Sequence, residues 1–208
     1  MKLKTKLFGH SYEFKSLREV MAKANEEKSG DRLAGIGAES AEERVAAKVV
    51  LSHVNMNELR NTPAVPYEDD EVTRVIQDAV NEKIFDGFKN MTVGEFREWL
   101  LSEKTDTAMI RRVSRGLTSE MVAAACKLMS NLDLIYAAKK MRVSAHCNTT
   151  IGLPGTFSSR LQPNHTTDDP KGIMASVMEG FSLGCGDAVL GLNPVDDSVE
   201  NVARILNM

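Results

Sequence analysis

A short stretch at residues 156–163, TFSSRLQP, lies between a Pro-Gly pair and a Pro-Asn pair, both of which interrupt regular structure. It carries two hydrogen-bonding side chains, Arg160 and Gln162, two positions apart. On a β-strand, residues two apart point to the same side. The spacing therefore predicts that Arg160 and Gln162 share one face, with Phe157 and Leu161 on the other.

A third polar group, Asn193, ends another predicted strand, DAVLGLNP at residues 187–194. Asn193 and Gly191 would share one face of this strand, while its leucines face the opposite way and suit packing against helices. A glycine inside a buried strand is typical of a place where a ligand or another backbone approaches closely.

The chemistry that these residues offer is binding rather than bond making. In parallel α/β architectures, ligands bind beyond the carboxyl ends of the strands, where Arg160, Gln162 and Asn193 are expected to meet. A guanidinium and two amides can hold a small polar molecule, but they supply no nucleophile and no general base. A structural interpretation stays open, in which the arginine is a salt-bridge partner and the asparagine forms a turn.

Metal sites and disulfides are not indicated. The acidic pairs at residues 168–169 and 196–197 come where helix N-termini favour negative charge. His146 and Cys147 lack a suitably spaced third ligand, and we leave them without a role. The three cysteines follow no metal-binding spacing and are expected to be buried thiols.

Two regions must position the candidate site. Residues 1–141 are predicted to be helical, and the first predicted helix is expected to end at Ser29-Gly30-Asp31. Capping boxes are predicted at Ser40 with Glu43 and at Thr92 with Glu95. The last predicted helix is apolar almost all round, which predicts burial. The expected helices cover residues 16–28, 40–53, 55–60, 69–88, 92–100, 106–115 and 118–140.

Residues 142–208 are predicted to alternate strand, helix, strand and helix. Asp169 caps the helix at residues 170–183, and a last helix begins near Ser198. The expected inner face of the last helix consists of Val199, Val202, Ala203 and Leu206. The alternation predicts an α/β fold with a right-handed parallel unit, as in a doubly wound sheet or an eight-stranded barrel. Two strands cannot bury both faces of such a sheet, so the sequence looks truncated.

The composition narrows the classes of partner. The 208 residues are 42% hydrophobic, which allows a core, and the net charge of -3 is evenly spread. Without a basic face or a long apolar run, neither nucleic acid nor membrane is an expected partner. The N-terminus lacks a secretory signal, so we expect a cytoplasmic protein.

Several motifs make the sequence similar to a known family. It resembles the large subunit of ethanolamine ammonia-lyase along its whole length. The motifs that carry the resemblance include SGDRLAGIGAESAEERVAAK, GLTSEMVAAACKLMSNLDLIYAAKKM, NTTIGLPGTFSSRLQPN and GDAVLGLNPVDDSVEN. The segment RVSAHC departs from the family pattern. The resemblance implies a helical N-terminal region followed by a TIM-type (β/α)8 barrel that continues beyond residue 208.

The resemblance also implies a reaction and a set of roles. Adenosylcobalamin would support a radical deamination of ethanolamine to acetaldehyde and ammonia, with the protein positioning and shielding the reactants. Arg160 and Asn193 would lie near the substrate hydroxyl and Gln162 near its amine, with Leu161 in the same substrate-binding segment. Pro194 would contact the corrinoid. The expected partners are the small subunit and further large subunits, within a bacterial microcompartment.

Alternatives to an active enzyme remain. An ammonium group beside Arg160 needs nearby carboxylates, which the family supplies from later strands, so we expect the 208-residue chain alone to be inactive. The helical region could serve mainly as an assembly or oligomer-contact module. In a third interpretation the chain is an independent small α/β binding protein.

Overall fold

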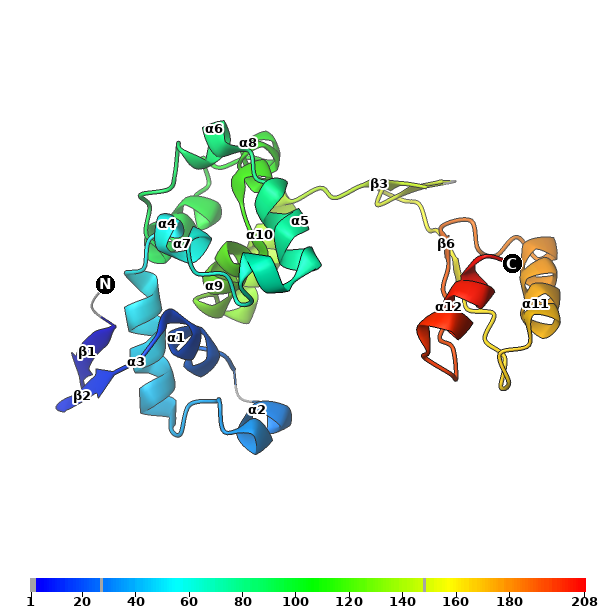
Figure 1. Cartoon of the computed structure of the whole chain (residues 1–208). Coiled ribbons are helices and arrows are strands. Elements are labelled where there is room, and N and C mark those ends of the chain that lie inside the picture. Colours follow the sequence, from blue (N-terminus) through cyan, green and yellow to red (C-terminus); the bar gives the residue numbers. More distant parts are fainter. Residues whose placement is uncertain (1–2, 27, 148) are drawn as a thin grey trace. The chain divides into compact units, whose positions relative to one another are not determined.

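The computed structural model describes residues 3–26, 28–147 and 149–208. The chain forms two compact units, Met1–Met141 and Arg142–Met208, and each is described by itself (Figure 1). Among the described residues, no helix is both long and apolar enough to cross a membrane.

The first unit begins with a β-hairpin that the helical prediction missed. Strands β1 (Lys4–Leu7) and β2 (His10–Glu13) pair antiparallel, with Leu7 opposite His10. The two residues of the turn, Phe8 and Gly9, have φ angles of 53° and 80°. Positive φ at both central positions is what a two-residue hairpin turn of type I′ requires.

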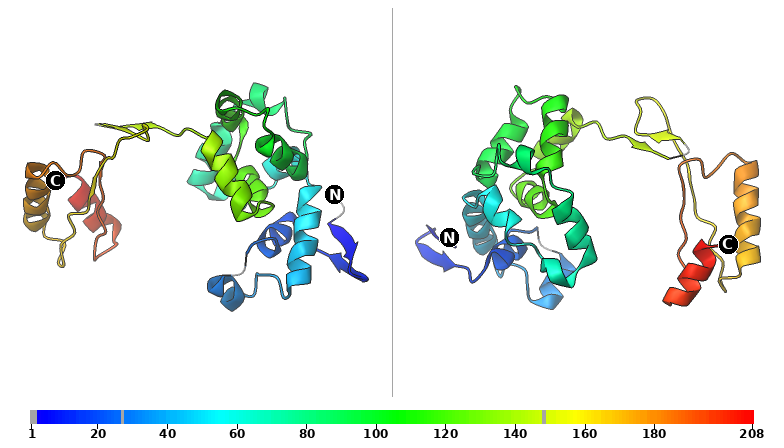
Figure 2. Two further views of the ribbon diagram at one scale, coloured as in Figure 1. Left: turned by 180° about the vertical axis from the view of Figure 1, so that it is seen from behind. Right: turned by 45° about the horizontal axis from the view of Figure 1, so that its top comes forward.

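Helices make up the rest of this unit (Figures 1 and 2). The α-helices are α1 (Leu17–Lys23), α2 (Ser29–Ala34), α3 (Ala41–Ser52), α4 (Met56–Arg60), α5 (Glu71–Asp78), α6 (Glu82–Phe85), α7 (Val93–Leu101), α8 (Thr107–Val113), α9 (Ser119–Lys127) and α10 (Asn131–Lys140), and the 3₁₀ turns are η1 (Tyr67–Asp69) and η2 (Ser114–Gly116).

Side-chain caps explain where several helices begin. The capping box of Thr92 and Glu95 is confirmed at the start of α7. The box expected at Ser40 is only half formed. The Ser40 hydroxyl accepts from the backbone N–H of Glu43, but the Glu43 carboxylate accepts from the backbone N–H of Glu39.

Two of the expected long helices are interrupted. The helix predicted over residues 16–28 ends at Lys23, and Ser29-Gly30-Asp31, expected to stop it, instead begins α2. The helix predicted over residues 69–88 divides into α5 and α6, because Asn81 caps a new helix through the backbone N–H of Ile84. Helix α5 also turns two valines to solvent, since Val72 and Val75 are 65% and 61% exposed.

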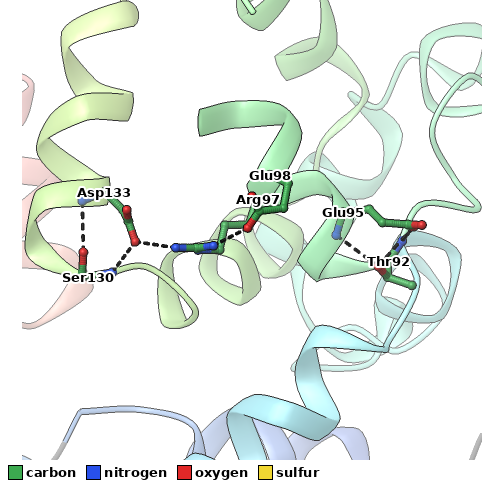
Figure 3. A network of polar contacts seen from close by, with 6 residues as sticks. All are labelled: Thr92, Glu95, Arg97, Glu98, Ser130 and Asp133. Atoms are coloured by element: carbon green, nitrogen blue, oxygen red, sulfur yellow. Dashed lines mark hydrogen bonds and ion pairs between the residues drawn. The ribbon is translucent and has the colours of Figure 1, made fainter. Parts of the chain in front are cut away.

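The helix predicted over residues 118–140 is likewise two helices, α9 and α10. Ser130 starts the second one with a capping box, since its hydroxyl accepts from the backbone N–H of Asp133 while the Asp133 carboxylate accepts from the backbone N–H of Ser130. Arg97 on α7 binds the same carboxylate at 2.7 Å, so the break is also anchored to a neighbouring helix (Figure 3). The predicted burial all round is wrong, because Leu132 is 77% exposed.

The core of the first unit lies between these helices. Its largest fully buried side chains are Leu51, Met56, Leu59 and Met121, which come from α3, α4 and α9. The same core contains a row of aromatic rings, in which Phe88 packs against Phe85 on one side and Phe96 on the other. A smaller cluster joins α7, α8 and α10 through Leu100, Ile110, Met129 and Ala137.

The second unit contains a small hairpin and then the predicted alternation of strand and helix. Strands β3 (Ala145–His146) and β4 (Thr150–Ile151) pair antiparallel. They are followed by β5 (Arg160–Leu161), α11 (Pro170–Ser182), β6 (Val189–Leu190) and α12 (Val199–Leu206). β5 and β6 pair parallel, which confirms the parallel unit. Asp169 caps α11 through the backbone N–H of Gly172, also as predicted.

Other expectations for the second unit are wrong. The strands are shorter than the predicted segments, and β6 is not buried, since Val189 and Leu190 are 49% and 42% exposed. The buried face of α12 consists of other residues than predicted. Asn201 and Ile205 are buried, whereas Leu206 is 67% exposed. Ile205 joins a small core with Ile173 and Val177 of α11.

Candidate functional site

The pairing of β5 with β6 brings the polar residues to one edge. Arg160 pairs with Val189 and Leu161 with Leu190, and the backbone N–H of Gly191 donates to the Leu161 carbonyl at 2.8 Å. Because the strands are parallel, their carboxyl ends lie at the same edge. The segments that follow them carry the remaining candidate residues. We call residues 160–164 and 191–196 the strand-end rim.

Arg160 contacts the neighbouring segment at Gly191. A Cβ atom built on Gly191 would lie 2.5 Å from Nε and 2.7 Å from Cζ of Arg160. The guanidinium therefore occupies the space that a side chain at position 191 would fill. The expected close approach at Gly191 was that of a ligand or another backbone, and the group found there is instead the Arg160 side chain.

The polar side chains of the rim are open to solvent. Arg160, Gln162 and Asn193 are all exposed. None of the ion pairs between described residues involves Arg160, so the structure does not support the salt-bridge interpretation of this residue. Pro194, the expected corrinoid contact, is half-buried. Besides these three side chains, the rim contains the Asn164 amide and the Asp196 carboxylate.

Leu161 lies differently from the other candidate residues. Its side chain packs against Gly180 of α11, where an added Cβ would lie 2.8 Å from Cδ1 of Leu161. It thus holds β5 against the helix, and it faces α11 rather than the Arg160 side of the strand. Phe157, expected on the same face as Leu161, is fully exposed.

Backbone contacts fix the two ends of the strand pair. On the side where the strands begin, the Asp187 carboxylate accepts from the backbone N–H of Ser159 at 2.7 Å and from its hydroxyl at 2.5 Å. These bonds hold the pKa of Asp187 below its ordinary value. On the rim side, the Asn164 side-chain oxygen accepts from the backbone N–H of Asn193 at 2.9 Å.

Asp168 makes a second connection on the rim side. Its carboxylate accepts from the backbone N–H groups of Val195 and Asp196, each at 2.9 Å. These two bonds, followed by the bond from the Asn201 amide, keep the pKa of Asp168 low. Sequence reasoning assigned the pair 168–169 to the helix N-terminus, which is correct for Asp169 alone. No local pattern identifies Asp168, because its partners lie 27 residues or more along the chain.

The other candidate residues lie in or near the β3–β4 hairpin. The Nδ1 atom of His146 lies 2.9 Å from the Thr150 hydroxyl, and the Cys147 thiol donates to the Thr149 carbonyl. The expectation of buried thiols is wrong, since Cys126 and Cys147 are exposed and Cys185 is half-buried. Within residues 3–26, 28–147 and 149–208, no three His, Cys, Asp or Glu side chains gather as metal ligands. Asn148, part of one resembling motif, lies outside the described residues.

Comparison with known proteins agrees with the resemblance seen in the sequence. The family model for "Ethanolamine ammonia lyase large subunit (EutB)" matches residues 12–208. The ethanolamine ammonia-lyase large subunit of Escherichia coli strain K12 is 57% identical over 207 residues, which cover 100% of this chain and 46% of that protein. The large subunit from Salmonella typhimurium strain LT2 is 56% identical with the same coverage. The chain thus spans about half the length of these relatives, and it belongs to the family of ethanolamine ammonia-lyase large subunits.

Proposed function

We propose that this chain forms the N-terminal part of an ethanolamine ammonia-lyase large subunit, which converts ethanolamine to acetaldehyde and ammonia. Residues 1–141 would be a helical domain. Residues 142–208 would be the first two β/α units of a TIM-type (β/α)8 barrel. The parallel β5–β6 pair supports this proposal, because a barrel of this type is built from such pairs with helices outside.

The strand-end rim would bind the substrate. Arg160 and Asn193 would donate hydrogen bonds to the hydroxyl of ethanolamine, and the Gln162 amide oxygen would accept from its ammonium group. The observation that carries the proposal is the position of the Arg160 guanidinium over Gly191, because it places the cation at the carboxyl edge of both strands. Ligands of parallel α/β proteins bind at that edge. Leu161 would position this segment through its packing on α11.

The residues of the rim fit the adenosylcobalamin that the family implies. Pro194 offers a half-buried apolar ring beside the exposed Asn193 amide, a combination that suits a corrinoid with its apolar face and amide side chains. When bound, adenosylcobalamin would supply the radical chemistry of the deamination. Arg160, Gln162 and Asn193 would bind and orient the substrate. Their side chains donate and accept hydrogen bonds without transferring protons.

The charge of the site requires a further contribution. Two positive charges about 4 Å apart repel by about 4 kcal/mol at an effective dielectric constant of about 20. The ammonium group of the substrate would therefore need carboxylates close to Arg160. Asp168 and Asp187 are both engaged with backbone N–H groups, and so is Asp196 of the rim, which accepts from the backbone N–H of Ser198. We propose that carboxylates from the remaining barrel strands balance the charge, so that the 208-residue chain is inactive by itself.

The proposed partners follow from the family. They are ethanolamine, the small subunit and further copies of the large subunit, with the complex located in the cytoplasm inside a bacterial microcompartment. The names of the relatives support the first two of these, since they describe an ammonia-lyase of ethanolamine with a large subunit.

The test is restoration of turnover. The chain would be extended by the missing part of the large subunit, combined with the small subunit and adenosylcobalamin, and assayed for acetaldehyde. We expect turnover with the native sequence and its loss in Arg160→Ala, because the substrate hydroxyl loses its charged donor. Arg142→Ala, at the start of the second unit and outside the rim, is the control. Turnover that is indifferent to Arg160→Ala would reject the site.

A second function, assembly, is favoured by one observation. Helix α10 exposes Leu132 and Ile135, which are 77% and 64% accessible. Exposed apolar side chains on a helix are typical of a contact surface. If the helical domain served assembly alone, Leu132→Glu with Ile135→Glu would change the mass of the complex in sedimentation, while Arg160→Ala would change nothing.

A further inference from the structure

Asp168 is a buried charged residue next to the strand-end rim. Its side chain is 4% exposed, and its backbone has a φ of 53°, which a residue other than glycine adopts rarely. It directly precedes Asp169, the N-cap of α11. A buried carboxylate is stable only where hydrogen bonds or opposite charges compensate its loss of water.

The contacts of Asp168 run to the chain that follows β6. Its carboxylate accepts from the backbone N–H groups of Val195 and Asp196 and, at 2.8 Å, from the Asn201 side chain. Asn201 is 7% exposed, and its amide also donates to the Asp196 carbonyl at 2.7 Å. Arg204 donates to the backbone carbonyl of Asp168 at 3.2 Å and closes the cluster.

These bonds hold the backbone directly after Asn193 and Pro194, the residues proposed to bind ligands. Val195 and Asp196 come directly after Asn193 and Pro194, so the Asp168 carboxylate fixes the backbone on one side of that pair. On the other side, the backbone N–H of Gly191 is bound to the Leu161 carbonyl. Between these two anchors, the described residues 192–194 make one hydrogen bond to the chain that follows β5, from the backbone N–H of Asn193 to the Asn164 side chain.

We propose that Asp168 is a positioning residue that holds Asn193 and Pro194 at the rim for the substrate and the corrinoid. This inference rests on the proposed function. It assigns Asp168 no contact with either ligand. Asn201 and Arg204 support it. Asn201 donates to Oδ2 of Asp168, the oxygen that also accepts from Val195 and Asp196, and Arg204 donates to the Asp168 backbone carbonyl.

The first test measures the backbone directly. Amide hydrogen exchange of the 208-residue chain would be followed by NMR for Asp168→Asn and for the matched variant Asp187→Asn. Asp187 binds the backbone at the opposite end of the same strand pair. Loss of one charged acceptor is expected to lower the protection of the Val195 and Asp196 amides about tenfold in Asp168→Asn. In Asp187→Asn, protection should fall at Ser159 instead.

The second test measures function in the complete large subunit assembled with the small subunit and adenosylcobalamin. We expect Asp168→Asn to raise the KM for ethanolamine about tenfold, and to weaken adenosylcobalamin binding, because Asn193 and Pro194 are no longer held in place. Asp187→Asn should lower thermal stability without changing this KM. A merely structural role of Asp168 would affect stability alone, as in the control.

The outcomes separate this inference from the proposed function. If the native complex does not deaminate ethanolamine, the proposed function fails, and hydrogen exchange alone decides whether Asp168 positions the rim. Unchanged protection at Val195 and Asp196 in Asp168→Asn, or an equal loss in Asp187→Asn, overturns the inference. If Asp168→Asn does not fold, Asn201→Ala decides in its place, with loss of protection at Asp196 expected and unchanged protection contradicting the proposal.

Discussion

Arg160 and Gly191 form one steric unit, in which the guanidinium of the first fills the space left by the absent side chain of the second. The pair joins β5 to the chain segment after β6 at the edge where parallel strands end. The absence of a side chain at Gly191 therefore allows the Arg160 guanidinium to lie where it does. A side chain at position 191 would force the guanidinium into a different position.

Gly191→Ala should separate ligand binding from folding. The new Cβ would lie 2.5 Å from Nε of Arg160, so the guanidinium must move, and the end of a long exposed side chain moves at little cost in stability. We expect the free energy of unfolding to change by less than about 1 kcal/mol. The KM for ethanolamine of the complete enzyme should rise about tenfold, since a displaced donor loses its bond.

The control for this variant is Gly30→Ala, because a Cβ at Gly30 meets nothing within 4 Å. Steady-state kinetics and urea unfolding of both variants would be compared. An unchanged KM in Gly191→Ala would mean that the position of Arg160 over the glycine has no part in binding.

Low pH should lower the stability of the second unit, because Asp168 and Asp187 become protonated. Hydrogen bonds from backbone N–H groups to Asp168, and from the Ser159 side chain and backbone to Asp187, lower both pKa values. A carboxylate with a lowered pKa in the folded state stabilises it fully above the unfolded value of about 3.9, and this contribution is lost as the pH falls through the folded value. We therefore expect stability to be constant from about pH 7 to about pH 5 and to fall below about pH 4.

The measurement is a urea titration by NMR at several pH values, using the amide signals of Val195 and Asp196. Asp168→Asn should be less stable at neutral pH and should show a smaller loss of stability in acid. An unchanged acid dependence in that variant would show that other carboxylates cause it.

Local patterns in the sequence predicted the starts of α7 and α11 correctly, because a cap and its helix are adjacent in the chain. They also predicted the parallel pairing of β5 and β6. The single helix expected over residues 118–140 was wrong although its break has a local signal, Ser130 with Asp133, because the continuous apolar pattern outweighed it. The displaced inner face of α12 has a different cause. Asn201 is buried by its bonds to Asp168, a partner 33 residues away that periodicity does not reveal.

At the candidate site, too, features that depend on neighbouring residues were predictable, whereas contacts between distant segments were not. The spacing of Arg160 and Gln162 predicted that the two side chains share one face of a strand, and this stays a prediction. Gly191 predicted the close approach of a ligand or a backbone, whereas the group that lies against it is the Arg160 side chain. Asp168 was missed, because its role depends on contacts between two loops. Contacts of this kind depend on the fold rather than on any short motif.

Ser130→Ala should destabilise the first unit. The hydroxyl of Ser130 accepts from the backbone N–H of Asp133 at 3.2 Å at the start of α10. Loss of such a cap costs about 1 kcal/mol. Urea unfolding followed by the fluorescence of Trp99, the only tryptophan of the chain, would measure it.

Thr118→Val is the matched control for this cap. Thr118 precedes α9 but makes no side-chain cap bond, and its hydroxyl is buried without a partner among the described residues. Replacing an unsatisfied hydroxyl by a methyl group of similar size should be neutral or stabilising. Equal destabilisation by both changes would contradict the capping role assigned to Ser130.

Gly116→Ala should destabilise the packing of η2 against α6. Gly116 is buried, and an added Cβ would lie 2.9 Å from the backbone nitrogen of Phe85 and 3.1 Å from the ring of Phe88. A backbone atom and a buried ring cannot move aside as the Arg160 side chain can, so overpacking should cost about 1–3 kcal/mol. The free energy of unfolding in urea, compared with that of Gly30→Ala, measures the effect. If both alanine variants are equally stable, the contact between Gly116 and Phe85 is looser than the structure indicates, because a tight contact with backbone leaves no room for a methyl group.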